Sequence, residues 1–444
     1  MKISIEIGEP VSYFVKVYVC CDYAEKKAKG RINVVTLSPV AQTPSAQQYF
    51  QKGLGLKKVA QELLEQDYHS NIVDYLRAHD FMLRLGDMAI HLAQEFGFCY
   101  GVDRAVEYAY QARAKFPTRR IFLTGEIIHN PHVNRRMLEM NIGFLSGQYQ
   151  NGLGVEDLAP EDVVILPAFG VTMQEFQRLR TIGCILVDTT CGSVLNVWKR
   201  VEQYARDGFT SVIHGKYYHE ETRATSSQAT KLGGHYLVIR DMAEAEKIGD
   251  FILGKLPRAE LLKLFARSLS SGFDPDLHLQ KIGVANQTTM LSSESLAIAE
   301  KLKQTMLAKH NAETVDQYFR TFDTICSATQ DRQDAIMKLV TAQKLDLMLV
   351  IGGYNSSNTT HLAALANQYT KTYHLDDPCC LTNVEVIRHK PYGSQDEIES
   401  RGWLPAGPIK IGLTAGASTP NNKIGEAVSR LARLRGLEVE DWLK

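Results

Sequence analysis

The chain has 444 residues, more than one hydrophobic core usually serves, and this length predicts about two to four domains. Hydrophobic residues make up 44% of the sequence and charged residues 23%, a balance typical of folded globular proteins that excludes disorder throughout. Fifty Lys and Arg residues balance fifty Asp and Glu residues, which excludes the broad positive field that attracts nucleic acid or anionic membranes, so we expect a small-molecule partner.

The amino-terminal part of the chain carries little information. Residues 51–80 have helical spacing, whereas the opening fifty residues show no pattern that predicts chemistry. The first thirty residues include several acidic side chains and no apolar signal-peptide core, and no apolar run approaches the ~20 residues that span a bilayer. We therefore expect a cytoplasmic protein, in a bacterial setting, whose partners include neither a membrane nor a nucleic acid.

Three of the eight cysteines occupy the same position in a repeated pattern. Each ends an apolar, strand-like segment and begins a stretch with helical spacing: Cys99 precedes YGVDRAVEYAYQARAK, Cys191 precedes GSVLNVWKRVEQYARDG, and Cys326 precedes SATQDRQDAIMKLVTAQ. In the second stretch Val194 and Trp198 are four residues apart and fall on one helical face. The pattern predicts the order strand, cysteine, helix three times.

A polar motif follows each predicted helix at nearly the same distance. His129, His219 and Asn355 lie 30, 28 and 29 residues after the respective cysteine, each at the end of a β-like run. A second apolar run then closes each unit, at Phe169, Thr288 and Ser418. Because such βαβ-like units favour parallel sheets, whose functional residues gather beyond the carboxyl ends of the strands, we expect the polar motifs to converge.

The repeats divide the chain near the cysteines. The fold class we expect is α/β, with three pseudo-repeated α/β units. The predicted segments are a partly helical N-terminal extension (1–85), a first unit (86–190), a second unit (191–325) with an insertion near 251–280, a third unit (326–431) and a C-terminal tail (432–444).

The position of the cysteines suggests metal chemistry without deciding it. A helix N-terminus carries partial positive charge and favours thiolate over thiol, which suits a metal ligand or a nucleophile. Structural zinc normally takes four ligands, whereas a four-iron cluster with three protein thiolates leaves one iron open to substrate. Spacing alone leaves an iron-sulfur cluster, a zinc site and buried structural cysteines as alternatives. We interpret the remaining cysteines as structural or incidental: Cys20, Cys21, Cys184, Cys379 and Cys380.

Ser and Asn residues supply a candidate anion site. Asn355, Ser356, Ser357 and Asn358 stand between a strand and a predicted helix, where their side chains and free N–H groups can hold a phosphate, and Ser418 repeats the arrangement. Ordinary N-capping explains either motif taken alone.

Candidate acid and base groups lie in the other motifs. His219, Glu220 and Glu221 are adjacent, and a carboxylate near a metal centre can deliver a proton. The alternative is that these are solvent-exposed charges. His129 is equally typical of a hydrogen-bonded structural histidine, and Thr288 of an ordinary strand residue.

The motifs together resemble those of the 4-hydroxy-3-methylbut-2-enyl diphosphate reductase family, the last enzyme of the non-mevalonate isoprenoid pathway, in its cyanobacterial and plastid-like branch. The resemblance extends from about Tyr49 to Leu431. The motifs that carry it occur in the family's order: GFCYGVDRA, EIIHNPHVN, VDTTCGSV, HGKYYHEET, ANQTTM, TICSATQDRQDA, GGYNSSNT and TAGAST.

The resemblance implies a cofactor and a substrate site. The three units would form a trefoil around one 4Fe-4S cluster whose three cysteine ligands are Cys99, Cys191 and Cys326, and whose apical iron binds the substrate's hydroxyl oxygen. Glu221 would deliver a proton, Thr288 would orient the hydroxyl end of the substrate, and His219 would join them as a catalytic residue. The residues implied around the diphosphate are His129, His219, Ser356, Ser357, Asn358 and Ser418, with Thr288 at the other end of the substrate.

The activity implied is a reductive dehydroxylation of (E)-4-hydroxy-3-methylbut-2-enyl diphosphate to isopentenyl and dimethylallyl diphosphates, with a ferredoxin or flavodoxin as electron donor.

The chain departs from the family's pattern at Phe169, where many bacterial members have histidine, and at Gly192-Ser193 after the second cysteine. Two other classes stay open: a non-catalytic iron-sulfur sensor and a zinc-dependent hydrolase.

Overall fold

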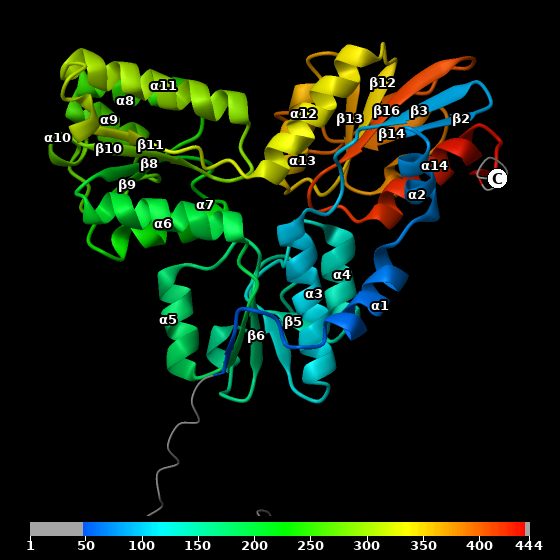
Figure 1. The fold of residues 1–444 in the computed structure, drawn as a ribbon, viewed down its shortest axis with the longest axis horizontal. Helices are drawn as coiled ribbons and strands as arrows, with labels where there is room; N and C mark the ends of the chain where they lie inside the picture. Colours follow the sequence, from blue (N-terminus) through cyan, green and yellow to red (C-terminus); the bar gives the residue numbers. More distant parts are fainter. Residues whose placement is uncertain (1–47, 440–444) are drawn as a thin grey trace, which may run out of the picture. The chain divides into compact units, whose positions relative to one another are not determined.

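The computed structural model describes residues 48–439, so our expectations for the opening residues and for the last part of the C-terminal tail lie outside the described residues. Three sheets dominate the described chain, and helices cover them (Figure 1). Neighbouring strands are parallel in all three sheets with one exception, the pair β2 and β3. The expected α/β fold class with three units is confirmed.

The first sheet has the strand order β1-β7-β6-β4-β5. Its strands are β1 (Tyr49–Phe50), β4 (Ile121–Leu123), β5 (Ile142–Phe144), β6 (Val163–Leu166) and β7 (Ile185–Asp188). The helices of this part of the chain are α1 (Lys57–Tyr68), α3 (Tyr100–Lys115), α4 (Pro131–Glu139) and α5 (Met173–Ile182), with the short turn η1 (Val155–Asp157). One face of the sheet packs against α1, α3 and α4, and the other against α5, so the strands β4, β6 and β7 are buried on both sides.

The second sheet has the order β11-β10-β8-β9. Its strands are β8 (Thr210–His214), β9 (Tyr236–Ile239), β10 (Ile282–Asn286) and β11 (Phe319–Thr321). The surrounding helices are α6 (Gly192–Arg206), α7 (Glu220–Thr230), α8 (Met242–Ile252), α9 (Arg258–Leu264), α10 (Pro275–His278) and α11 (Ser292–Lys309), with the turn η2 (Val315–Gln317). The segment expected as an insertion, 251–280, holds α9 and α10, and its Leu261, Phe265 and Phe273 are buried in the core of this unit.

The third sheet has the order β13-β12-β16-β3-β2. Its strands are β2 (Met82–Leu85), β3 (Met88–Leu92), β12 (Leu347–Ile351), β13 (Thr372–Leu375) and β16 (Ile409–Ala415). Its helices are α2 (Asn71–Ala78), α12 (Ser327–Ala342), α13 (Ser357–Ala366) and α14 (Asn421–Leu434), with the turn η3 (Pro378–Cys380). A separate antiparallel hairpin pairs β14 (Val386–His389) with β15 (Ile398–Arg401).

The strand before the first cysteine belongs to a different unit from the one we expected. We placed residue 86 at the start of the first unit, but β3 pairs with β16 of the third sheet, and in Figure 1 the blue strands β2 and β3 lie beside the red end of the chain. The reason is packing: Met88 and Ile90 are fully buried in one core with Ile409 and Ile411. A sequence pattern shows that a strand forms, not which distant strand it pairs with.

The segment that we expected as an extension is likewise built into the units. Leu54 and Ala60 belong to the core of the first unit, and Val73 and Leu76 to the core of the third. The helices expected within 51–80 are present as α1 and α2. At Cys191 and Cys326 the chain passes between sheets, because β7 is the last strand of the first sheet along the chain and β11 the last of the second. The predicted start of the C-terminal tail at residue 432 is wrong, because it lies inside α14, and Ala432 and Val439 are buried in the core of the third unit.

Among the described residues, no helix combines the length and the apolar composition needed to cross a bilayer.

A double-mutant cycle tests the assignment of β3 to the third sheet. Ile90 and Ile411 are fully buried register partners, so Ile90→Ala and Ile411→Ala should each lower the free energy of unfolding by about 2–5 kcal/mol. Because the side chains are neighbours, urea denaturation should give a coupling energy of at least about 0.5 kcal/mol. The matched control is Ile121→Ala in the first sheet, which should add to Ile90→Ala without coupling. Coupling to Ile121 and none to Ile411 would contradict the topology.

Candidate functional site

Each cysteine of the repeat is the N-cap residue of a helix. Cys99 caps α3, Cys191 caps α6 and Cys326 caps α12, all three with extended backbone angles. The order strand, cysteine, helix is therefore confirmed three times. In each case the strand before the cysteine belongs to one unit and the helix after it packs in the next, so the cysteines lie where the chain passes between units.

The backbone N–H of each cysteine donates a hydrogen bond to a loop that follows the neighbouring parallel strand. The three bonds are Cys99 N to Ala417 O at 3.2 Å, Cys191 N to Ala168 O at 3.0 Å, and Cys326 N to Thr288 O at 3.3 Å. The accepting loops follow β16, β6 and β10, which are the sheet neighbours of β3, β7 and β11. The carboxyl ends of paired strands thus hold all three cysteines in equivalent positions.

The three cysteines are half-buried and lie near one another, since Cys191 acts electrostatically on Cys99, and Cys99 on Cys326. A Cβ on Gly101 would lie 2.5 Å from the Cys191 Sγ, so the first turn of α3 approaches this thiol as closely as glycine allows. Burial raises the pKa of Cys99, and the charge of Cys191 adds to the rise. Burial also raises the pKa of Cys326 to about 11, with smaller effects of Cys99 and Glu221 in the same direction. For Cys99 and Cys326, burial outweighs the expected preference of a helix N-terminus for thiolate.

Glu221 is connected to the third cysteine through Thr288. Its carboxylate accepts two hydrogen bonds, from Thr288 N at 2.6 Å and from Thr288 Oγ1 at 3.0 Å, while the carbonyl of the same threonine holds the Cys326 N–H. The Glu221 side chain is fully buried, and burial raises its pKa to about 7 in spite of these two bonds. A carboxyl group with such a pKa can carry and release a proton near neutral pH.

His219 is held as a neutral acceptor at the start of α7. Its Nδ1 accepts the backbone N–H of Glu221 at 3.1 Å, which leaves the ring proton on Nε2. Burial, and then the charge of His129, lower the pKa of His219 well below its usual range. The ring therefore offers a neutral N–H donor and carries no positive charge of its own.

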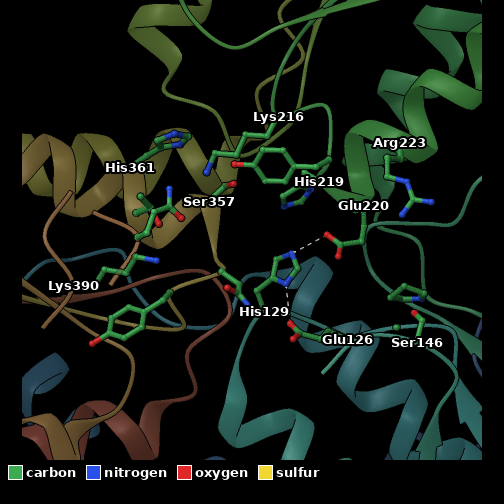
Figure 2. A pocket seen from close by; sticks show the side chains of 18 of the residues that line it. Glu126, His129, Ser146, Lys216, His219, Glu220, Arg223, Ser357, His361 and Lys390 are labelled. Atoms are coloured by element: carbon green, nitrogen blue, oxygen red, sulfur yellow. Dashed lines mark hydrogen bonds and ion pairs between the residues drawn. The ribbon is translucent and has the colours of Figure 1, made fainter. Parts of the chain in front are cut away.

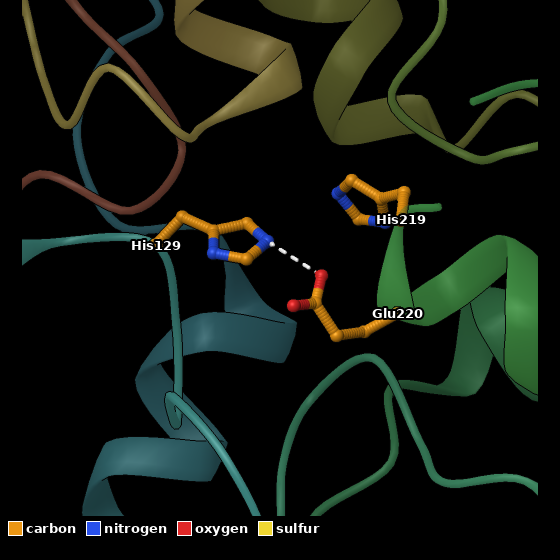
Figure 3. Close-up of side chains that lie close together, drawn as sticks. All are labelled: His129, His219 and Glu220. Atoms are coloured by element: carbon orange, nitrogen blue, oxygen red, sulfur yellow. Dashed lines mark ion pairs between the residues drawn. The ribbon is translucent and has the colours of Figure 1, made fainter. Parts of the chain in front are cut away.

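His129 lies beside His219 and is stacked on Phe169. Its Nδ1 is 2.9 Å from Glu126 Oε2, and its Nε2 is 3.6 Å from Glu220 Oε2. Figure 2 draws both contacts, and Figure 3 shows the one with Glu220 from close by. The rings of His129 and Phe169 are stacked at 4.3 Å between centroids, and the rings of the two histidines meet edge to face at 5.1 Å. Phe169 fills its position with an apolar ring that cannot donate a hydrogen bond.

The predicted Ser and Asn residues come together in the third unit, and most of their side chains form hydrogen bonds with other residues of the protein. Ser356 caps α13 by accepting from Thr359 N at 3.3 Å, so the capping role that we considered is present. Ser357 accepts from Gln287 Nε2 at 3.2 Å. Two further bonds tie these motifs to the cysteine loops and to the first unit: Asn358 Oδ1 accepts from Ala417 N at 2.9 Å, and Ser418 Oγ donates to His129 O at 3.1 Å.

A cavity of about 780 Å³ opens beside these groups and receives side chains from all three units (Figure 2). Among the predicted residues, it is lined by His129, His219, Asn355 and Ser357, together with Glu220. The three cysteines, Glu221, Thr288, Ser356, Asn358 and Ser418 are absent from the lining as the described residues define it. The predicted residues thus divide into a group that lines this cavity and a group, with the cysteines, that does not.

Several polar residues of the cavity escaped the sequence interpretation. His361 lies four residues after Ser357 on α13, a helical spacing that could have identified it, and its Nδ1 is 2.8 Å from Thr289 O. Burial lowers the pKa of His361 to about 4. Lys216 precedes His219 by three residues, within a motif already singled out, whereas no sequence signal connects Lys390 to the site.

His129, His219 and Glu220 also resemble a metal site. One ligand atom of each lies within 4.8 Å of the others, which is close enough for a shared ion, as the zinc alternative requires (Figure 3). A second group with the same property, formed by Asp376, Cys380 and Glu397, lies in the third unit. Metal analysis distinguishes these sites from a cluster on the three cysteines.

Comparison with known proteins gives consistent similarities. A family model described as LytB protein matches residues 90–432. The 4-hydroxy-3-methylbut-2-enyl diphosphate reductase of Thermosynechococcus vestitus is 45% identical over 397 residues, covering 88% of this chain and 96% of the relative. The enzyme of the same name from Trichormus variabilis is 44% identical over 391 residues, with the same two coverages. The solved structure of the E-1-hydroxy-2-methyl-but-2-enyl-4-diphosphate reductase from Plasmodium falciparum shares the fold, with a TM-score of 0.55 and 22% identity over 76% of this chain and 86% of that one.

The helix cap formed by His219 can be tested directly. His219→Ala removes the acceptor of the Glu221 N–H and should lower the free energy of unfolding by about 1 kcal/mol. His219→Asn keeps a side-chain acceptor at the cap and should recover most of this loss in urea denaturation. Equal losses in the two variants would show that the ring does not act as a cap.

Proposed function

The chain belongs to the LytB protein family, and from this membership we propose that it catalyses the reaction for which its relatives are named, the reduction of (E)-4-hydroxy-3-methylbut-2-enyl diphosphate. The relatives' activity makes the chain an oxidoreductase, and we place it at the last step of the non-mevalonate isoprenoid pathway, as the sequence resemblance implies. The reaction consumes two electrons and two protons and removes the allylic hydroxyl group as water, which gives isopentenyl and dimethylallyl diphosphates.

The family is an iron-sulfur family, and we propose that Cys99, Cys191 and Cys326 hold one 4Fe-4S cluster. Three thiols at equivalent helix starts, near one another, are the soft donor set that such a cluster takes. The close approach of Gly101 to the Cys191 Sγ also suits a tightly enclosed group. The cluster would supply electrons and a Lewis-acidic iron. A bound metal would keep the thiols deprotonated in spite of the burial that raises the pKa of Cys99 and Cys326.

The observation that carries this proposal is the chain of contacts from Glu221 through Thr288 to Cys326. A carboxyl group with a pKa of about 7 lies beside a residue whose carbonyl fixes a proposed cluster ligand. The proton of Glu221 is therefore available close to the reacting end of the substrate, where hydroxide must leave as water. The Thr288 hydroxyl lies in the same place and can orient the substrate's hydroxyl group.

The other end of the substrate belongs in the cavity. There we assign the diphosphate to His129, His219 and Ser357, with Ser356, Asn358 and Ser418 fixing the loops around it. The neutral His219 would donate from Nε2, and a diphosphate held on these groups would place the allylic carbons toward Glu221. A ferredoxin or flavodoxin as electron donor, and a location in the cytoplasm, stay predictions.

Removal of the cysteines tests the cofactor. Cys99→Ala, Cys191→Ala and Cys326→Ala, each purified anaerobically, should lose most of their iron and acid-labile sulfide, because three thiolates are the only protein ligands we assign. Cys184→Ala, which changes a buried cysteine outside the repeat, should keep both. A full cluster in any of the three ligand variants would contradict its assignment, and zinc without iron or sulfide in the unaltered protein would favour the hydrolase.

Glu221→Gln tests proton delivery. The variant should keep its cluster and bind substrate, while kcat falls by about 100-fold or more because the amide cannot donate the proton. The control Glu246→Gln changes an exposed carboxylate on α8 and should leave kcat unchanged. If Glu221→Gln loses its cluster, the fall in kcat reflects damage to the structure and not the loss of a proton donor. If turnover is undiminished, Glu221 does not deliver the proton. A sensor would show no turnover even in the unaltered protein.

The pH dependence of kcat gives an independent test. With its pKa raised to about 7, Glu221 is protonated below pH 7 and loses the proton above it, so kcat should fall as the pH rises through about 7. Thr288→Val removes a hydrogen bond that lowers the pKa of Glu221, so this pKa should rise and the fall in kcat should occur at a higher pH. Thr288→Ser keeps the hydroxyl, so the fall in kcat should occur at the same pH as in the unaltered protein. A shift to lower pH in Thr288→Val would contradict the role of this bond.

A further inference from the structure

Two lysines from different units project into the cavity. Lys216 comes from the loop between β8 and α7 of the second unit, and Lys390 follows β14 in the third. Both are half-buried, and Figure 2 shows their side chains extending toward the part of the cavity where Ser357 lies. Within residues 48–439, neither ammonium group has a hydrogen-bond or ion-pair partner.

The backbone of each lysine is firmly held. The Lys216 N–H donates to Gln287 Oε1 at 3.1 Å, and its carbonyl accepts the His219 N–H at 2.9 Å, so Lys216 and His219 close one turn. The Lys390 N–H donates to the His374 carbonyl at 3.0 Å. The positions of both side chains are thus coupled to the sheets and not only to surface loops.

The surroundings of the two ammonium groups favour the binding of an anion. Lys390 Nζ lies 5.7 Å from the ring centroid of Tyr354, a contact that favours its charge, and the Tyr354 hydroxyl is held by Glu397 Oε2 at 2.7 Å. Burial, and then the charge of Lys390, lower the pKa of Lys216. The two ammonium groups are thus close enough to repel each other, and a bound anion would relieve that repulsion.

One further cationic side chain lines the cavity, Arg223 of α7, and Figure 2 shows it well apart from Ser357. The other groups near Ser357 supply little positive charge. His219 and His361 are neutral because burial lowers the pKa of both, and Phe169 stacks on His129 with no donor of its own. A diphosphate carries two to three negative charges at neutral pH, and neutral donors alone compensate such a charge poorly.

We propose that Lys216 and Lys390 bind the diphosphate group of the substrate and supply the positive charge that the neutral histidines and Ser357 do not. This inference rests on the proposed function and adds two residues to its binding site. The second and third units each contribute one cation, so the diphosphate links the two units through charge-assisted hydrogen bonds.

The test uses anaerobic holoenzyme and inorganic diphosphate as the probe. Lys216→Met and Lys390→Met should each raise the Kd for diphosphate by about tenfold, as measured by isothermal titration calorimetry. Each variant should also raise KM for the allylic substrate by a similar factor, while kcat stays within about twofold of the unaltered protein. Lys390→Arg keeps the charge and should bind within about threefold of the unaltered protein. Lys344→Met removes an exposed lysine outside the cavity and should change nothing, which controls for net charge.

The outcomes separate this inference from the proposed function. If the unaltered protein and both Met variants bind diphosphate equally well, the role of the lysines is overturned, while the proposed reductase activity is unaffected. A loss of affinity in Lys344→Met as large as in the cavity variants would overturn it too, because the effect would then be nonspecific. If the unaltered protein binds diphosphate through the lysines but does not turn over the allylic substrate, the proposed function fails and the anion site stands.

Discussion

The site depends on three backbone hydrogen bonds, each from a cysteine N–H to a loop carbonyl at the end of the adjacent parallel strand. Each bond fixes the start of a helix at the point where the chain leaves one sheet and enters the next unit. Because parallel strands end at one edge of a sheet, the same edge that anchors a cysteine also carries a polar motif. The cysteines and the groups to which we assign the substrate are therefore positioned together, and Thr288 contacts both Cys326 and Glu221.

Burial then sets the charge of each group in the site. It raises the pKa of Glu221 toward neutrality and lowers the pKa of His219 and His361, so the site keeps a proton on a carboxyl group while these two histidines stay uncharged. The proton delivery that we propose for Glu221 and the neutral N–H donation of His219 follow from the same physical cause. Positive charge reaches the cavity on longer side chains, Lys216, Arg223 and Lys390.

Local patterns predicted much of this arrangement, and non-local packing limited the rest. The strand, cysteine, helix order and the repeat spacing are properties of short segments, and they identified Cys99, Cys191 and Cys326 correctly as equivalent helix starts. Partners in a sheet are set by burial between distant segments, so the pairing of β3 with β16 was missed. His361 could be found from its helical spacing to Ser357. Nothing local marks Lys390, because only the fold of the third unit brings it to the cavity.

The central claim is that three cysteines at the unit crossings hold one iron-sulfur cluster that faces the proton donor Glu221. Anomalous diffraction at the iron edge from anaerobically grown crystals tests it most directly. We predict a single iron-rich peak bounded by the Sγ atoms of Cys99, Cys191 and Cys326, with its free side toward Glu221 and Thr288. An iron or zinc peak at His129, His219 and Glu220, or at Asp376, Cys380 and Glu397, with none between the three thiols, would contradict the account.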